Sequence, residues 1–111
     1  MQHWNLQQLE TPGGSRSPLV LDAADETARA VLIGLEPGQS LGDHQVKEHA
    51  FLVVLEGQVR AEAGGEAVDA EAGSLLRFSP DERHSVSSAE GARLLMLLAP
   101  WPGAGHYRGS L

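Results

Sequence analysis

The chain of 111 residues contains no cysteine. This absence excludes disulfides, thiol catalysis and cysteine-ligated zinc or iron–sulfur sites. Any bound metal must therefore be held by histidine, by carboxylates or by backbone oxygen.

Basic residues are also scarce, because 8 Lys and Arg stand against 15 Asp and Glu, for a net charge of −7. Phosphate binding needs clustered basic charge, so neither nucleic acid nor an anionic membrane is an expected partner. The longest apolar runs, residues 50–55 and 94–99, are far shorter than the about 20 residues of a membrane-spanning helix. The first ten residues lack the pattern of a secretory signal, so a cytoplasmic protein is expected.

The composition is that of a folded globular chain, with 41% hydrophobic and 21% charged residues. Its length suits a single domain over residues 1–111. The 13 glycines and 6 prolines separate short runs rich in valine, leucine and isoleucine. These runs are residues 18–21, 30–35, 51–55, 74–78 and 93–98. Short apolar runs separated by turn residues predict an all-β antiparallel sandwich or barrel.

Two hairpins can be predicted inside this pattern. Residues 22–30 contain good helix formers but are short and flanked by strand-like runs, so they are expected to form a hairpin with its tip near Asp25 and Glu26. Residues 58–63 alternate between polar and apolar, Gly64-Gly65 suits the positive φ angles of a tight turn, and residues 66–70 return as a strand.

Two histidines stand at regular distances from glycines. His44 follows Gly38 after five residues, and Gly57 comes later, while Gly73 precedes His84 in a second segment. The segments 38–57 and 73–88 resemble the two motifs of the cupin superfamily, G-x5-H-x-H-x3–4-E-x6-G and G-x5-P-x-G-x2-H-x3-N. The resemblance implies a jelly-roll barrel of about ten short antiparallel strands, and a homodimer that pairs through outer sheets or exchanged N-terminal strands.

The spacing of the motifs is kept, but several of their residues are replaced. In the first motif, Val46 stands for the second histidine and Ala50 for the glutamate. In the second, Ser79 stands for the proline, Asp81 for the glycine and Ser88 for the asparagine.

In cupins the motif histidines and the glutamate converge inside the barrel on a divalent metal, and such a site suits iron, manganese, nickel or zinc. Val46 and Ala50 cannot ligate a metal, so the resemblance leaves His44 and His84. A third ligand is open between Glu48, which shares the strand parity of His44, and His49, which needs a bulge to point inward. The alternative is that residues 47–49 form a solvated turn at the barrel rim.

Three functions stay open from the sequence. The first is a small-molecule binding protein, whose interior pocket is marked by the side chains His44, Val46, Ala50, Leu52 and His84. Replacing two ligands by Val46 and Ala50 enlarges and dries this cavity, which favours an apolar or aromatic ligand. The second is a metal-dependent enzyme of the dioxygenase, isomerase or decarboxylase type. The third is a structural or protein-interaction barrel that uses its outer sheet and residues 101–107. The sequence assigns no catalytic residue.

Overall fold

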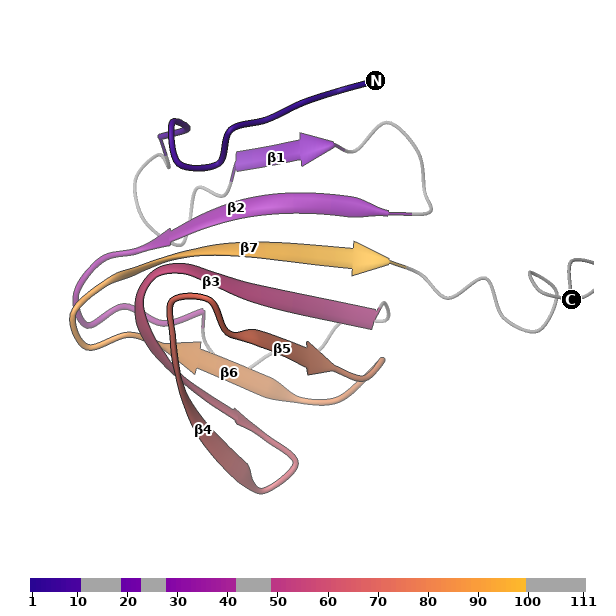
Figure 1. Ribbon diagram of the computed structural model, residues 1–111. Coiled ribbons are helices and arrows are strands. Elements are labelled where there is room, and N and C mark those ends of the chain that lie inside the picture. Colours follow the sequence, from indigo (N-terminus) through magenta and orange to yellow (C-terminus); the bar gives the residue numbers. More distant parts are fainter. Residues whose placement is uncertain (11–18, 23–27, 42–48, 100–111) are drawn as a thin grey trace, which may run out of the picture.

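The computed structural model describes residues 1–10, 19–22, 28–41 and 49–99, and these form strands and turns with no helix (Figure 1). The strands are β1 (Leu19–Asp22), β2 (Arg29–Leu35), β3 (His49–Ala63), β4 (Glu66–Glu71), β5 (Leu75–Phe78), β6 (His84–Ser87) and β7 (Ala92–Ala99). All of the pairings between them are antiparallel. The all-β class predicted from the sequence is therefore confirmed.

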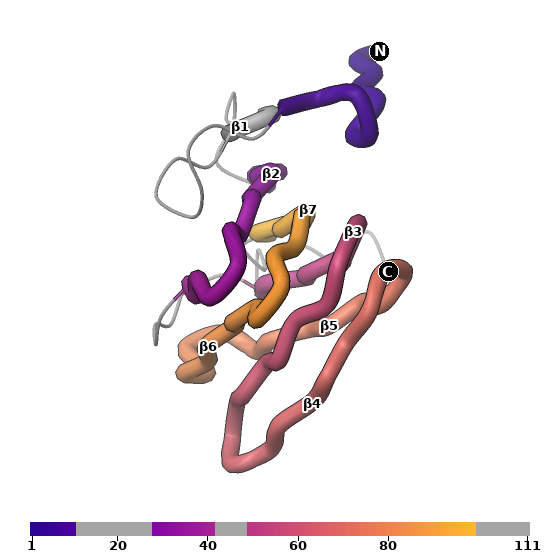
Figure 2. Tube along the Cα trace, turned by 90° about the vertical axis from the view of Figure 1, so that its left-hand side faces the viewer, coloured from indigo at the N-terminus to yellow at the C-terminus, as the bar shows by residue number. Residues whose placement is uncertain are grey.

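Strand β3 belongs to two sheets. Its first half lies between β7 and β5, in a sheet that β2 and β1 extend. Its second half lies between β4 and β6. The β3–β4 hairpin extends away from the end of the molecule that carries β1 (Figure 2). The described residues hold seven strands rather than about ten, and one reason is that the 15 residues of β3 run through both sheets without interruption.

The two predicted hairpins are present. β1 and β2 are paired antiparallel, and the predicted tip at residues 25 and 26 lies outside the described residues. β3 pairs with β4 from Ala63 and Glu66 onward, and the intervening Gly64 and Gly65 have φ angles of 58° and 82°. Both values lie in the left-handed region that a two-residue hairpin turn requires.

The side chains of β3 change face halfway along the strand. Ala50, Leu52 and Val54 are buried in the first half, whereas Val59 and Ala61 are buried in the second. A register irregularity between residues 54 and 56 accounts for the change. Because side chains alternate with a period of two, one extra residue turns the next apolar residues back toward the core. The bulge lets a single strand supply the interior from both sheets.

Gly57 stands at this bend. Its φ angle is 82°, and a Cβ atom built on it would overlap the carbonyl oxygen of Gly91 and lie 2.9 Å from the Cα atom of Ala92. The positive φ angle excludes most side chains, because they rarely adopt this conformation. The contacts with Gly91 and Ala92 leave no room for any side chain. This glycine, the last residue of the first motif, allows β3 and the turn before β7 to touch.

A single hydrophobic cluster fills the space between the sheets, and it draws residues from β2 through β7. Among the described residues, His84 and Ser88 are the buried polar side chains. Ser88 serves the backbone. Its hydroxyl donates to the carbonyl of Gln58 at 2.6 Å and accepts from the N–H of Gly91 at 3.0 Å. Its own backbone is paired with Gly38 at 2.8 Å and Gln39 at 3.0 Å. Ser88 therefore ties the turn of the first motif to β3 and to the turn before β7.

The bend at Gly57 can be tested with two glycines that share a φ angle. Gly57 and Gly65 both have a φ of 82°, but a Cβ on Gly65 meets no atom within 4 Å. We expect Gly65→Ala to cost about 1–2 kcal/mol of unfolding free energy from backbone strain alone. Gly57→Ala adds a backbone clash and is expected to cost at least about 3 kcal/mol. Urea unfolding followed by circular dichroism measures both, and equal losses would contradict this account.

The role of Ser88 gives a second prediction. Ser88→Ala leaves the carbonyl of Gln58 and the N–H of Gly91 without their hydroxyl partner, so we expect a loss of about 1–3 kcal/mol in unfolding free energy. Ser87→Ala, on the neighbouring and more exposed residue, is the control and is expected to change stability by less than about 0.5 kcal/mol. If thermal or urea unfolding finds the same stability for Ser88→Ala and Ser87→Ala, this role of the Ser88 hydroxyl is refuted.

Candidate functional site

His84 is the first residue of β6 and lies in the interior, with 2% of its surface exposed. Two residues further on, Val86 is fully buried on the same side of the strand, as the alternation of a β-strand requires. Across the sheet His84 pairs with Ala63 of β3. The histidine of the second motif therefore points into the core among apolar neighbours.

Two contacts fix the orientation of the His84 ring. It stacks on Phe78 of β5, with a distance of 4.1 Å between ring centroids and an angle of 5° between planes. Its Nδ1 atom lies 3.1 Å from the carbonyl oxygen of Glu82, and its Nε2 atom is buried. Phe78 pairs in turn with Ala50 of β3. Phe78 thus contacts His84 through its ring and is the cross-strand neighbour of the position where the first motif has its glutamate.

The turn between β5 and β6 keeps its shape although the motif residues differ. The N–H of Glu82 donates to the carbonyl of Ser79 at 3.1 Å, and the N–H of Ser79 donates to the Oε1 atom of Glu82 at 3.0 Å. Asp81, which replaces the motif glycine, still has a positive φ angle of 62°. Aspartate is among the residues that adopt this conformation most readily, so the left-handed turn survives the replacement.

The other predicted site residues divide into two groups. Ala50 and Leu52 lie in the core with none of their surface exposed, so the side chain at the glutamate position is buried and apolar. His44, Val46 and Glu48 lie outside the described residues, as do Trp101 and the rest of residues 101–107. Their roles remain predictions.

His49 lies on the opposite face of β3 from Ala50 and Leu52, as strand alternation indicates. Its Nδ1 atom is 3.1 Å from the Nη2 atom of Arg77 on β5, in an exposed contact. The structure therefore brings His49 to the outer surface of the sheet and does not bring it together with His84.

The residues present do not fit the metal site of the family. Within residues 1–10, 19–22, 28–41 and 49–99, no three His, Asp or Glu side chains are grouped so that they could hold a metal ion. At the four family positions the sequence has His44, Val46, Ala50 and His84, which amount to two neutral imidazoles and no carboxylate. Divalent ions of the expected kind are usually held by at least three protein donors.

A small hollow opens beside Phe78. Its volume is about 200 Å³, and its apolar lining includes Ala61, Ala63, Leu76 and Phe78. Gly64 and Val68 also line it, together with three charged residues, namely Glu66, Arg77 and Glu82. The hollow therefore reaches Phe78, the aromatic neighbour of His84, through a lining that is both apolar and charged.

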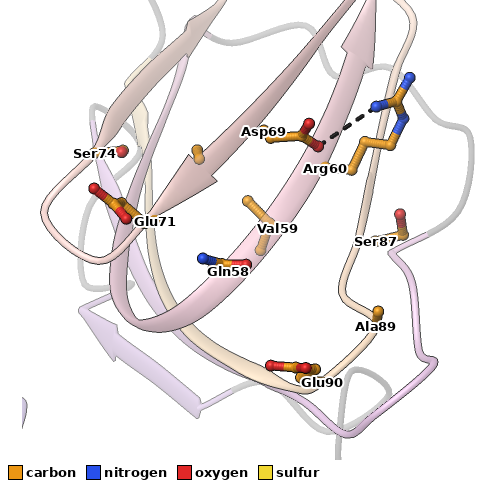
Figure 3. A pocket seen from close by; sticks show the side chains of 10 residues that line it. Gln58, Val59, Arg60, Asp69, Glu71, Ser74, Ser87, Ala89 and Glu90 are labelled. Carbon is orange, nitrogen blue, oxygen red and sulfur yellow. Dashed lines mark hydrogen bonds and ion pairs between the residues drawn. The ribbon is translucent and has the colours of Figure 1, made fainter.

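A second, polar hollow of about 710 Å³ lies near β3, β4 and the end of β6 (Figure 3). It was not predicted from the sequence. Arg60 and Asp69 face one another there, with 3.4 Å between Nη1 and Oδ1, and the Nε atom of Arg60 is also 3.2 Å from Glu62. The guanidinium charge is therefore already balanced by carboxylates. The register that aligns Arg60 with Asp69 and with Ser87 arises only when the three strands pair.

Comparison with known proteins agrees with the motif spacing. Residues 31–99 match the cupin domain family, which is more than half of the chain. The chain belongs to the cupin domain family. None of the curated proteins matches the sequence significantly.

Solved structures share the fold at low sequence identity. The Cnp3 cupin domain of Schizosaccharomyces pombe has a TM-score of 0.80 at 12% identity, over 96% of this chain and 80% of that one. A conserved protein of unknown function from Streptococcus pyogenes has a TM-score of 0.74 at 16% identity, over 92% and 90% of the two chains. A predicted oxalate decarboxylase from Thermotoga maritima has a TM-score of 0.64 at 24% identity, over 68% and 69%. These likenesses show the fold. Within the described part of the chain, no helix is long and apolar enough to cross a membrane.

Proposed function

We propose that this cupin binds a small molecule in the barrel interior, and that the ligand meets the ring of His84. The observation that carries the proposal is the burial of this imidazole among apolar side chains. Among the described residues, Ser88 is the other buried polar side chain, and both of its hydrogen-bonding capacities serve the backbone. A mostly apolar cavity with one convergent polar group is the usual form of a small-molecule site.

The surroundings of His84 favour a small ligand with an apolar or aromatic body. Ala50 and Leu52 present no polar atom from their side chains, and Phe78 offers an aromatic face and edge. The hollow beside Phe78 measures about 200 Å³, and drug-sized sites usually exceed about 300 Å³. A compound of roughly one ring is therefore the appropriate size of probe. His44 and Val46 complete the proposed pocket from the first motif.

The competing function is a metal-dependent enzyme, in which Glu48 joins His44 and His84 as a third ligand. One family of variants separates the two hypotheses. His84→Ala removes the interior imidazole, His84→Leu removes it while keeping the core filled, and His49→Ala removes an exposed imidazole on the outer face. Circular dichroism first establishes that each variant is folded.

We expect tag-free protein to hold far less than one metal per chain by mass spectrometry, as purified and after incubation with Fe(II), Mn(II), Ni(II) or Zn(II). In a thermal-shift screen of single-ring compounds, the stabilisation seen with the parent and with His49→Ala is expected to disappear in both His84 variants. About one metal per chain, lost with His84 but kept with His49→Ala, would instead establish the metalloenzyme. Equal ligand binding by all variants would refute an interior site at His84.

A second copy of the chain is the proposed partner. One sheet contains β1, β2, β7, β5 and the first half of β3. On its outer face, Leu75 and Leu97 are 62% and 38% exposed. Val53 pairs with Leu75 and Phe51 pairs with Leu97, so these apolar residues form one continuous surface. An exposed apolar sheet face of this kind is typical of a subunit contact.

We expect the parent to sediment as a dimer and the double variant Leu75→Glu/Leu97→Glu to sediment as a monomer, because both copies would then bury charges. Val68→Glu is the control, since Val68 is 44% exposed but lies on β4, which pairs with the second half of β3 and is not part of this sheet. Analytical ultracentrifugation measures all three proteins. A monomeric parent, or dissociation by Val68→Glu to the same extent, would contradict the proposed interface.

A further inference from the structure

The contact between His84 and Glu82 determines which nitrogen of the ring carries a hydrogen. The Nδ1 atom lies 3.1 Å from the carbonyl oxygen of Glu82. A carbonyl oxygen only accepts hydrogen bonds, so the contact is a hydrogen bond only when Nδ1 donates. In a neutral imidazole the other nitrogen, Nε2, then carries a lone pair and no hydrogen.

Glu82 is held in place by its own turn. Its carboxylate accepts from the N–H of Ser79 at 3.0 Å, and its N–H donates to the carbonyl of Ser79 at 3.1 Å. Both interactions close the turn that contains the left-handed Asp81. The carbonyl group that meets His84 therefore belongs to a constrained segment rather than to a loosely held loop.

The stack on Phe78 restricts the ring further. With parallel planes and 4.1 Å between centroids, the imidazole cannot tilt without losing the aromatic contact. A half-turn of the ring about the Cβ–Cγ bond would keep its plane but put the Cδ2 carbon in place of Nδ1 opposite the Glu82 carbonyl, and the hydrogen bond would be lost. Stacking and hydrogen bonding thus select one orientation and one tautomer together.

The charges of the described residues disfavour an anionic ligand. No lysine or arginine is among the buried residues of the described chain. Around the hollow beside Phe78, Glu66 and Glu82 outnumber Arg77. Among the described residues, a carboxylate placed in this apolar interior would meet the lone pair of Nε2 and no buried lysine or arginine, so its desolvation would be costly.

We infer that Glu82 is a positioning residue that holds His84 in the Nδ1–H tautomer, so that the interior site accepts a hydrogen bond and selects neutral ligands with an O–H or N–H donor over carboxylates. The ligand class rests on the proposed function, because it assumes that a small molecule reaches His84. The tautomer follows from the contacts of the chain itself.

His49 can serve as an internal reference when the tautomer of His84 is measured. Its Nδ1 atom is 3.1 Å from the guanidinium of Arg77. A guanidinium only donates, so Nδ1 of His49 accepts and the hydrogen of the neutral ring resides on Nε2. The two histidines are therefore expected to show opposite tautomers in one sample.

The first experiment is a long-range ¹H–¹⁵N correlation spectrum of ¹⁵N-histidine-labelled protein at pH 8, above the about 6.5 at which an ordinary imidazole titrates. His84→Gln and His49→Gln assign the signals. We expect a hydrogen on Nδ1 of His84 and on Nε2 of His49. A hydrogen mainly on Nε2 of His84, or an even mixture of its two tautomers, would overturn the inference.

Two Glu82 variants test the positioning role. Glu82→Gln keeps an oxygen that accepts from the N–H of Ser79, so the Nδ1–H tautomer of His84 is expected to persist. Glu82→Ala opens the turn and is expected to give a mixture of tautomers. Glu66→Ala is the control, because it removes another carboxylate from the same hollow without touching the turn. An unchanged His84 spectrum in Glu82→Ala would refute the role of Glu82.

Phenol and benzoate test the ligand class, because at pH 8 they present the same ring with a neutral donor or with an anionic acceptor. We expect phenol to shift the Nε2 signal of His84 and to bind at least about tenfold more tightly than benzoate. Benzoate binding as tightly as phenol would overturn the selectivity. If the expected tautomer is found but His84→Leu binds phenol as tightly as the parent, the proposed function fails while the role of Glu82 stands.

Discussion

The architecture depends on the close approach of two backbone segments at Gly57. There β3 leaves one sheet and enters the other, and the carbonyl of Gly91 occupies the space that a side chain would need. The two halves of β3 carry different parts of the site. Ala50 pairs with Phe78 in the first half, and Ala63 pairs with His84 in the second. Without the bend, the aromatic ring and the imidazole would not meet.

The two motifs combine residues with separable physical tasks. Their glycines at positions 38, 57 and 73 all have φ angles between 82° and 94°, which few other residues adopt. Ser88, at the end of the second motif, connects three backbone segments. These tasks belong to folding and persist when the metal-ligand positions change to valine and alanine. The retained spacing is therefore explained by the backbone, and it carries no information on whether a metal is bound.

Much of the local structure was predictable because strand alternation and glycine placement act over a few residues. The hairpin around Gly64 and Gly65 and the outward face of His49 follow from such local rules. The stack of His84 on Phe78 was not predicted, because the two residues lie on strands whose relative placement depends on β3. The hydrogen bond from His84 to Glu82 was also missed, because it depends on the left-handed turn at Asp81, a position where the family motif has glycine.

The class of fold, the positions of the turns and the loss of two of the family's four metal ligands can all be read from the amino-acid sequence. These properties depend on residue chemistry and on short-range periodicity. The tertiary structure decided which face of the long strand is inside after the bulge, which ring lies against His84, and which of its nitrogens donates. Such properties depend on contacts between residues that only strand pairing and backbone packing bring within reach.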